Sequence, residues 1–141
     1  MVNNAMRNPD LPNEDFGFLA GCIEKSPKAM PSDIDMVLER RGCFLFAEWK
    51  HDHEKVSEGQ KIMLQALSRK PGVVVLIIRG DSKHGIVNSI YKVSPNEVKM
   101  VDSGVDGLKR LLNLFYNWAD SKTETDVMDW IADYNGAENG R

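Results

Sequence analysis

This chain of 141 residues has few cysteines, no long apolar run and no strong net charge. The two cysteines, Cys22 and Cys43, have no CxxC spacing, so we expect buried free thiols and no zinc site or disulfide. No stretch approaches the ~20 apolar residues of a membrane span, and the first residues lack the apolar core of a signal peptide. These absences predict a cytoplasmic protein without a membrane partner.

The formal net charge of -3 gives no general attraction to nucleic acid. Binding of a polyanion would therefore depend on a local basic patch or on a bound cation. The hydrophobic fraction of 42% and the charged fraction of 28% are typical of a globular protein, and the length suits one domain. We expect a single domain over residues 1–134 and a frayed tail over 135–141.

Apolar periodicity, caps and turn residues divide the chain into alternating helices and strands. We expect helices over 13–25, 53–70, 104–121 and 123–134, and strands over 33–40, 42–50, 72–80, 84–94 and 97–102. The expected inward face of the second helix carries Val56, Ile62, Met63, Ala66 and Leu67. The fold class is α/β, with a central mixed sheet of four to five strands flanked by helices in α-β-β-α-β order and two C-terminal helices.

The stretch "CFLFAEWK" places two charged residues within an otherwise apolar strand. Side chains alternate across a strand, so Glu48 and Lys50 share one face. A tight turn over 40–42 would pair this strand with "SDIDMVLE", in which Asp33 and Asp35 also share a face. Asp35 should then lie near Glu48, at the end of the hairpin far from the turn.

Carboxylates clustered in a half-buried sheet need a compensating charge, because burying each one unpaired costs several kcal/mol. A divalent cation supplies that charge, and Mg²⁺ prefers oxygen ligands such as Asp35, Glu48 and the backbone carbonyl of Trp49. Mn²⁺ should substitute for it. Lys50 beside the cation would orient or deprotonate a water, or offset charge on a phosphorus centre. This combination of residues predicts phosphodiester hydrolysis.

"PSDID", followed thirteen residues after Asp35 by "EWK", resembles the signature of the PD-(D/E)XK nuclease superfamily. The resemblance extends over roughly residues 13–80 and implies a restriction-endonuclease-like core, similar to Holliday-junction-resolvase-like or VRR-NUC-like members. It implies that Asp35, Glu48 and Lys50 are catalytic. Gln60 resembles the glutamine that holds the lysine or the DNA backbone in RecB-type and VRR-NUC-type members. Leu64 departs from the RecB pattern, which has a tyrosine there.

The resemblance implies a Mg²⁺-dependent endonuclease that acts on branched, double-stranded or single-stranded DNA. The chain lacks room for a separate DNA-reading domain, so we expect structure-specific or nonspecific cutting. Small nucleases of this superfamily often act as homodimers, and Met128, Trp130 and Ile131 are a candidate partner surface. Asp33 and Glu14 are candidates for an additional acid. Candidate phosphate contacts are Lys55, Lys61 and Lys83, with His84, Lys109 and Arg110 further along the chain.

Each site residue also has a structural interpretation that leaves function out. Glu48 and Lys50 can form a surface ion pair, and Asp35 can cap a strand entrance. Asp33 can be a turn-forming acid, and Glu14 can be a charge at a helix start. Gln60 can be a surface amide. The alternative function is a non-catalytic binding module on the nuclease fold, such as a phage or mobile-element factor that binds a host protein or nucleic acid.

Overall fold

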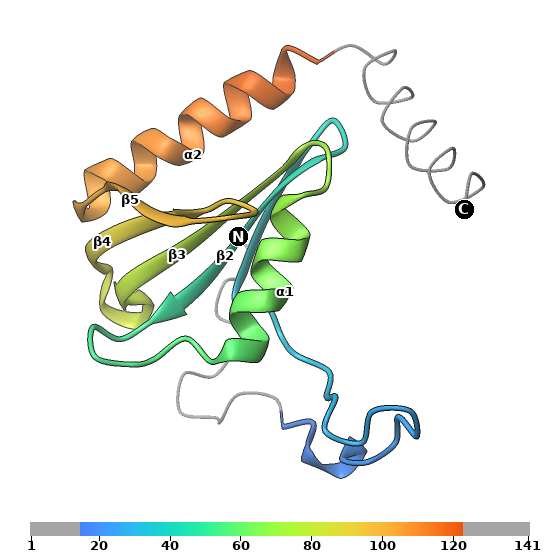
Figure 1. The fold of residues 1–141 in the computed structure, drawn as a ribbon. Helices are drawn as coiled ribbons and strands as arrows, with labels where there is room; N and C mark the ends of the chain where they lie inside the picture. The colour runs from blue at the N-terminus through green and yellow to red at the C-terminus, as the bar shows by residue number, and fades with distance from the viewer. Residues whose placement is uncertain (1–14, 123–141) are drawn as a thin grey trace, which may run out of the picture. The chain divides into compact units, whose positions relative to one another are not determined.

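A computed structural model describes residues 15–122 of the chain (Figure 1). The chain divides into two compact units, Met1–Ile34 and Asp35–Arg141. In the described part of the first unit, the helical segment is the short 3-10 helix η2 (Gly17–Leu19). The prediction of a helix over 13–25 is therefore wrong. Gly21 has a φ of 79°, which an α-helix cannot accommodate.

The second unit is an α/β structure with a mixed sheet of five strands and two α-helices, which confirms the predicted fold class at this level. Its strands are β1 (Met36–Arg40), β2 (Cys43–Lys50), β3 (Val73–Asp81), β4 (Ile86–Val93) and β5 (Val98–Asp102). The helices are α1 (Glu58–Ser68) and α2 (Gly104–Asp120), and a 3-10 turn, η3 (Ser82–His84), follows β3. The strands lie in the order β1-β2-β3-β4-β5, with β2 and β3 parallel and the other neighbours antiparallel.

The hairpin of β1 and β2 turns through two residues, as the sequence predicts. Arg40 pairs with Cys43, so the loop consists of Arg41 and Gly42. Both have positive φ, 50° and 80°, which is the requirement of the type I′ turn that matches strand twist. This turn fixes the register in which Met36 lies opposite Ala47.

Helix α1 makes the crossover that joins the parallel strands β2 and β3. It begins at Ser57, whose Oγ accepts a hydrogen bond from the Gln60 amide at 3.2 Å. Leu64 is its buried residue, 1% exposed, and packs with Val75 and Ile77 of β3. Ile62 is 60% exposed, so its expected place on the inward face is wrong. Ala66 is exposed as well.

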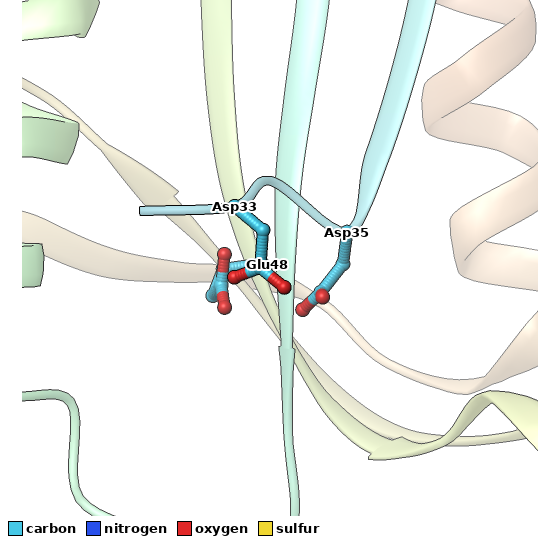
Figure 2. Close-up of side chains that lie close together, drawn as sticks. All are labelled: Asp33, Asp35 and Glu48. Carbon is cyan, nitrogen blue, oxygen red and sulfur yellow. The ribbon is translucent and has the colours of Figure 1, made fainter. Parts of the chain in front are cut away.

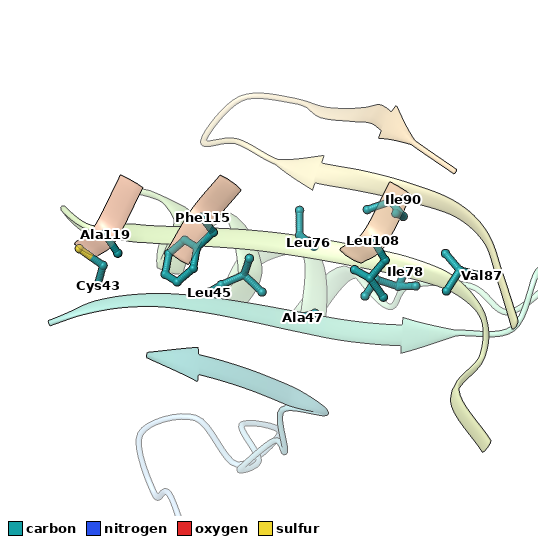
Figure 3. Close-up of a cluster of buried hydrophobic side chains, with 10 residues drawn as sticks. All are labelled: Cys43, Leu45, Ala47, Leu76, Ile78, Val87, Ile90, Leu108, Phe115 and Ala119. Carbon is teal, nitrogen blue, oxygen red and sulfur yellow. The ribbon is translucent and has the colours of Figure 1, made fainter. Parts of the chain in front are cut away.

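Helix α2 covers the opposite face of the sheet (Figure 1). Leu108, Phe115 and Ala119 of α2 pack against sheet residues that include Leu45 and Ile78 (Figure 3). The β-branched run of β3 therefore contributes to a core on each face, as its sequence predicts. Residue Cys43 is buried in this core as expected, whereas Cys22 is exposed and the expectation for it is wrong.

Strands β3 and β4 approach each other closely where the register of β3 shifts between Arg79 and Gly80. A Cβ on Gly80 would lie 2.0 Å from the carbonyl oxygen of Ile86, so this position accepts no side chain. The bulge directly follows Arg79, whose guanidinium contacts the loop after β2.

Three expectations fall on residues that the structure does not describe. The helix over 123–134, with its candidate partner surface, and the tail over 135–141 lie outside the described residues. The single domain over 1–134 therefore stays a prediction. Within residues 15–122, no helix is both long and apolar enough to cross a membrane.

Candidate functional site

Asp35 lies where the sequence predicts, beside the end of β2. Because Met36 is paired with Ala47, Asp35, which precedes Met36, lies next to Glu48, which follows Ala47. Oδ2 of Asp35 accepts a hydrogen bond from the backbone amide of Trp49 at 2.8 Å. Asp35 thus satisfies the Trp49 amide, a backbone donor of β2 beyond the last pair with β1, as expected for a strand-entrance cap. The same contact holds the Asp35 carboxylate next to Glu48.

Carboxylate oxygens of Asp35 and Glu48 lie within 4.8 Å of each other (Figure 2). Asp35 and Asp33 are exposed, whereas Glu48 is 4% exposed. Because Asp33 belongs to the first unit, we define the site by residues of the second. Like charges at this separation repel, and a bound cation would remove that repulsion.

Gln60 contacts the buried carboxylate directly. Its Nε2 donates to Oε1 of Glu48 at 3.4 Å, from the first turn of α1. Gln60 is half-buried and lies one helical turn before Leu64, on the side of α1 that faces the sheet. Gln60 thus differs from an ordinary surface amide in that it is half-buried and contacts Glu48.

Lys50 is buried too, at 9% exposure, on the same face of β2 as Glu48. Its Nζ lies 3.3 Å from Oε2 of Glu54, four residues further along. A surface ion pair between Glu48 and Lys50 does not describe these residues, because neither is at the surface.

The loop that follows β2 is held at several points that the sequence analysis missed. The amide of His51 donates to Oε1 of Glu54 at 3.1 Å, and the Glu54 amide donates back to the carbonyl of His51 at 3.0 Å. Arg79 donates from Nη1 to the carbonyls of His51, at 2.8 Å, and Glu54. The hydrogen bond from the His51 amide, assisted by the Lys50 ammonium, lowers the pKa of Glu54 despite an opposing contribution from desolvation.

The carbonyl of Trp49, expected to be a third ligand, faces the Asp35 side of β2. The N–H and C=O groups of one residue in an extended strand point to the same side, and the Trp49 N–H points at Asp35. The Trp49 side chain packs against the core under α2, on the face opposite Glu48. The backbone and carboxylate oxygens together are the hard donors that Mg²⁺ and Mn²⁺ prefer.

The candidate phosphate contacts divide between the two faces of the sheet. Lys55, Lys61 and Lys83 are exposed and belong to the loop after β2, the first turn of α1 and η3, all at the end of the sheet where β2 and β3 terminate. Arg110 lies on α2, which covers the other face, and donates to Asp102 of β5 at 3.1 Å. Lys109 is on α2 as well. Glu14, the other candidate acid, lies outside the described residues.

The geometry gathers an acidic pair, an ammonium and an amide at one end of the sheet. Asp35 and Glu48 can hold a hard cation, Lys50 places a positive charge on the same face, and Gln60 fixes one carboxylate oxygen. No family model, curated protein or solved structure matches the chain.

Proposed function

We propose that this protein is a Mg²⁺-dependent phosphodiester hydrolase, an endonuclease that acts on DNA, with Mn²⁺ able to substitute. The observation that carries the proposal is the shared placement of Asp35, Glu48 and Lys50 at one end of the sheet, with Gln60 bonded to Glu48. These are the four positions that the resemblance to PD-(D/E)XK nucleases assigns to the active site. We further propose that the mixed sheet with its α1 crossover is a restriction-endonuclease-like core.

The donor set fits a hard divalent cation. Carboxylate oxygens of Asp35 and Glu48 lie within 4.8 Å of each other, and the Trp49 carbonyl faces the same side. When bound, such a cation acts as a Lewis acid toward a phosphate oxygen and lowers the pKa of a bound water. Asp35 is exposed, so solvent reaches this side of the donor set.

The remaining contributions come from the protein itself. Gln60 orients the Glu48 carboxylate, and the Trp49 amide orients that of Asp35. The ammonium of Lys50 lies in a largely buried position, where its charge is less screened than in water and acts more strongly on an anionic phosphorus centre. It offsets the negative charge that grows as water attacks, or holds that water by a hydrogen bond.

The substrate we propose is DNA, bound through its phosphates. Lys55, Lys61 and Lys83 come from three segments at the same end of the sheet as Lys50, and contacts of this kind position a backbone without reading sequence. We therefore propose structure-specific or nonspecific cutting, and a homodimer when both strands are cut.

Cleavage of labelled linear, branched and single-stranded DNA, each with Mg²⁺, Mn²⁺ or chelator, tests the proposal. Lys50→Ala should retain Mn²⁺ binding and DNA affinity and lose ~100-fold or more in single-turnover rate, because its charge acts in the transition state. Glu48→Gln should lose both metal and cleavage. Absence of cation-dependent cleavage for every substrate, or near-parental cleavage by Lys50→Ala, would contradict the proposal.

A non-catalytic binding module, such as a phage factor that binds a host protein, is the second candidate. A groove of about 370 Å³ between α2 and the sheet favours it. Its mostly apolar lining includes Leu114 and Trp118, both exposed, on the face opposite Glu48. This function should survive Glu48→Gln and fail when Trp118 is replaced by Asp, which separates it from hydrolysis.

A further inference from the structure

The ammonium of Lys50 is held by a carboxylate that the signature motif does not include. Its Nζ lies 3.3 Å from Oε2 of Glu54, and the Lys50 side chain is 9% exposed. A buried ammonium on a flexible four-carbon stem needs a fixed negative partner if it is to keep one position. Glu54 is that partner, and it approaches from the loop and not from the acidic pair.

Glu54 is itself fixed by the backbone of its own loop. Oε1 accepts from the His51 amide at 3.1 Å, while Oε2 faces Lys50. The two oxygens thus have separate partners: the His51 amide fixes the direction of the carboxylate, and the Lys50 ammonium is the cation that it faces. The pKa of Glu54 is lowered, first by the His51 amide, so the carboxylate keeps its charge into more acidic solution than an ordinary glutamate.

Arg79 fixes the loop against the sheet. It is paired with Lys50 in the parallel register of β2 and β3, so it lies beside the lysine on the neighbouring strand. Its Nη1 donates to the carbonyl oxygens of both His51 and Glu54. One guanidinium therefore holds both ends of the turn that carries the carboxylate.

We propose that Glu54 and Arg79 are positioning residues for Lys50: Arg79 fixes the turn from His51 to Glu54, and Glu54 holds the ammonium on the face of the acidic pair. The inference rests on the proposed function, because it assigns these residues a role in the same reaction. Neither residue touches the substrate in this role. Both act by fixing the position of the Lys50 ammonium.

Glu54→Gln separates positioning from a structural role in the turn. A glutamine oxygen still accepts from the His51 amide, so the turn keeps its hydrogen bond, but the charge that faces Lys50 is lost. Single-turnover cleavage should fall ~10- to 100-fold with unchanged DNA and Mn²⁺ affinity, because a displaced lysine loses its alignment with the reacting atoms. Glu54→Asp should recover part of the rate. Glu58→Gln, an exposed carboxylate in the first turn of α1, is the matched control and should cleave at the parental rate.

Arg79→Met tests the other half of the inference without relying on cleavage. It keeps most of the apolar stem and removes the donors, so amide hydrogen exchange at His51 and Glu54 should become faster. In Glu54→Gln, exchange at these two amides should stay close to parental. Unfolding of Lys50→Met, Glu54→Gln and the double variant measures their coupling, which should be clearly different from zero.

The outcomes separate the two proposals. If the parental protein cuts DNA and Glu54→Gln cuts it equally fast, the positioning role is overturned, and the proposed hydrolase activity is retained. Zero coupling between Lys50 and Glu54, or unchanged exchange in Arg79→Met, would overturn it too. Parental protein that cuts no substrate would overturn the proposed function and the positioning role with it, whatever coupling is measured.

Discussion

Glu48→Gln should stabilise the cation-free protein, although it alters a buried residue. Oxygens of Glu48 and Asp35 lie within 4.8 Å of each other. Two like charges at that distance repel by about 3.5 kcal/mol at an effective dielectric constant of about 20, and by about 0.9 kcal/mol in bulk water. Because Asp35 is exposed, the lower part of this range applies, about 1–2 kcal/mol.

Two further effects act on the same substitution. A neutral amide costs less to bury than a carboxylate, which adds to the gain at Glu48, the 4% exposed position. The hydrogen bond from Gln60 loses its charge assistance, which offsets about 1 kcal/mol at most, since it is long at 3.4 Å. We therefore expect a net stabilisation of about 1 kcal/mol.

Urea unfolding in chelator and in Mn²⁺ measures both sides of this prediction. At a cation concentration of 100 times Kd, the parental protein should gain about 2.7 kcal/mol, and Glu48→Gln should gain far less, so the order of stability reverses. Glu97→Gln, an exposed carboxylate between β4 and β5, should leave both values within ~0.5 kcal/mol. A Glu48→Gln protein that is less stable than the parent in chelator by more than about 1 kcal/mol, or is equally stabilised by Mn²⁺, would refute the reasoning.

Two predictions concern α1 and the loop before it. Leu64→Ala should lower the free energy of unfolding by about 2–5 kcal/mol and Ile62→Ala by less than ~1 kcal/mol, because Leu64 is 1% and Ile62 60% exposed. Equal losses in chemical denaturation would contradict the observed rotation of the helix. The pKa of Glu54 is lowered by the His51 amide and Lys50, so its stabilisation is present above the ordinary glutamate pKa and is lost as pH falls through the lowered one. The stability difference between parental protein and Glu54→Gln should therefore shrink as pH falls below the ordinary glutamate pKa, and a difference that grows on acidification would contradict it.

Strand parity was enough to predict that Glu48 and Lys50 share a face, whereas Asp35 lies just before β1, which begins at Met36 and not at residue 33 as expected. The alternation in "CFLFAEWK" puts Glu48 and Lys50 on one face, and the two-residue turn fixes the register that ends with Met36 opposite Ala47, so that Asp35 comes next to Glu48. Both rules depend on local backbone geometry, and tertiary packing does not alter them. The continuous apolar run of β3 likewise predicted a strand buried on both faces.

The errors around the site arose where a contact distant in sequence decides the outcome, whereas the helix expected over 13–25 failed for the local reason of the positive φ at Gly21. An amphipathic pattern was expected to turn Ile62 inward, but α1 is rotated so that Gln60 reaches Glu48 and Leu64 fills the core. A polar residue that faces a buried charge cannot be recognised from apolar periodicity. Arg79 acts on backbone carbonyls of a distant loop, and such acceptors leave no signature in the residue types.

The two-residue turn between β1 and β2 also has a consequence for the order in which the site assembles. Asp35 and Trp49 are only fourteen positions apart, so the hairpin that unites the acidic residues closes a short segment, on a timescale of microseconds. Strand β3 can join only after the α1 crossover, which brings a larger loop-closure cost. Asp35 therefore meets Glu48 before Arg79 can fix the loop that holds Lys50. Because like charges disfavour strand pairing, the acidic pair opposes the pairing of β1 with β2, the same pairing that brings Asp35 to Glu48.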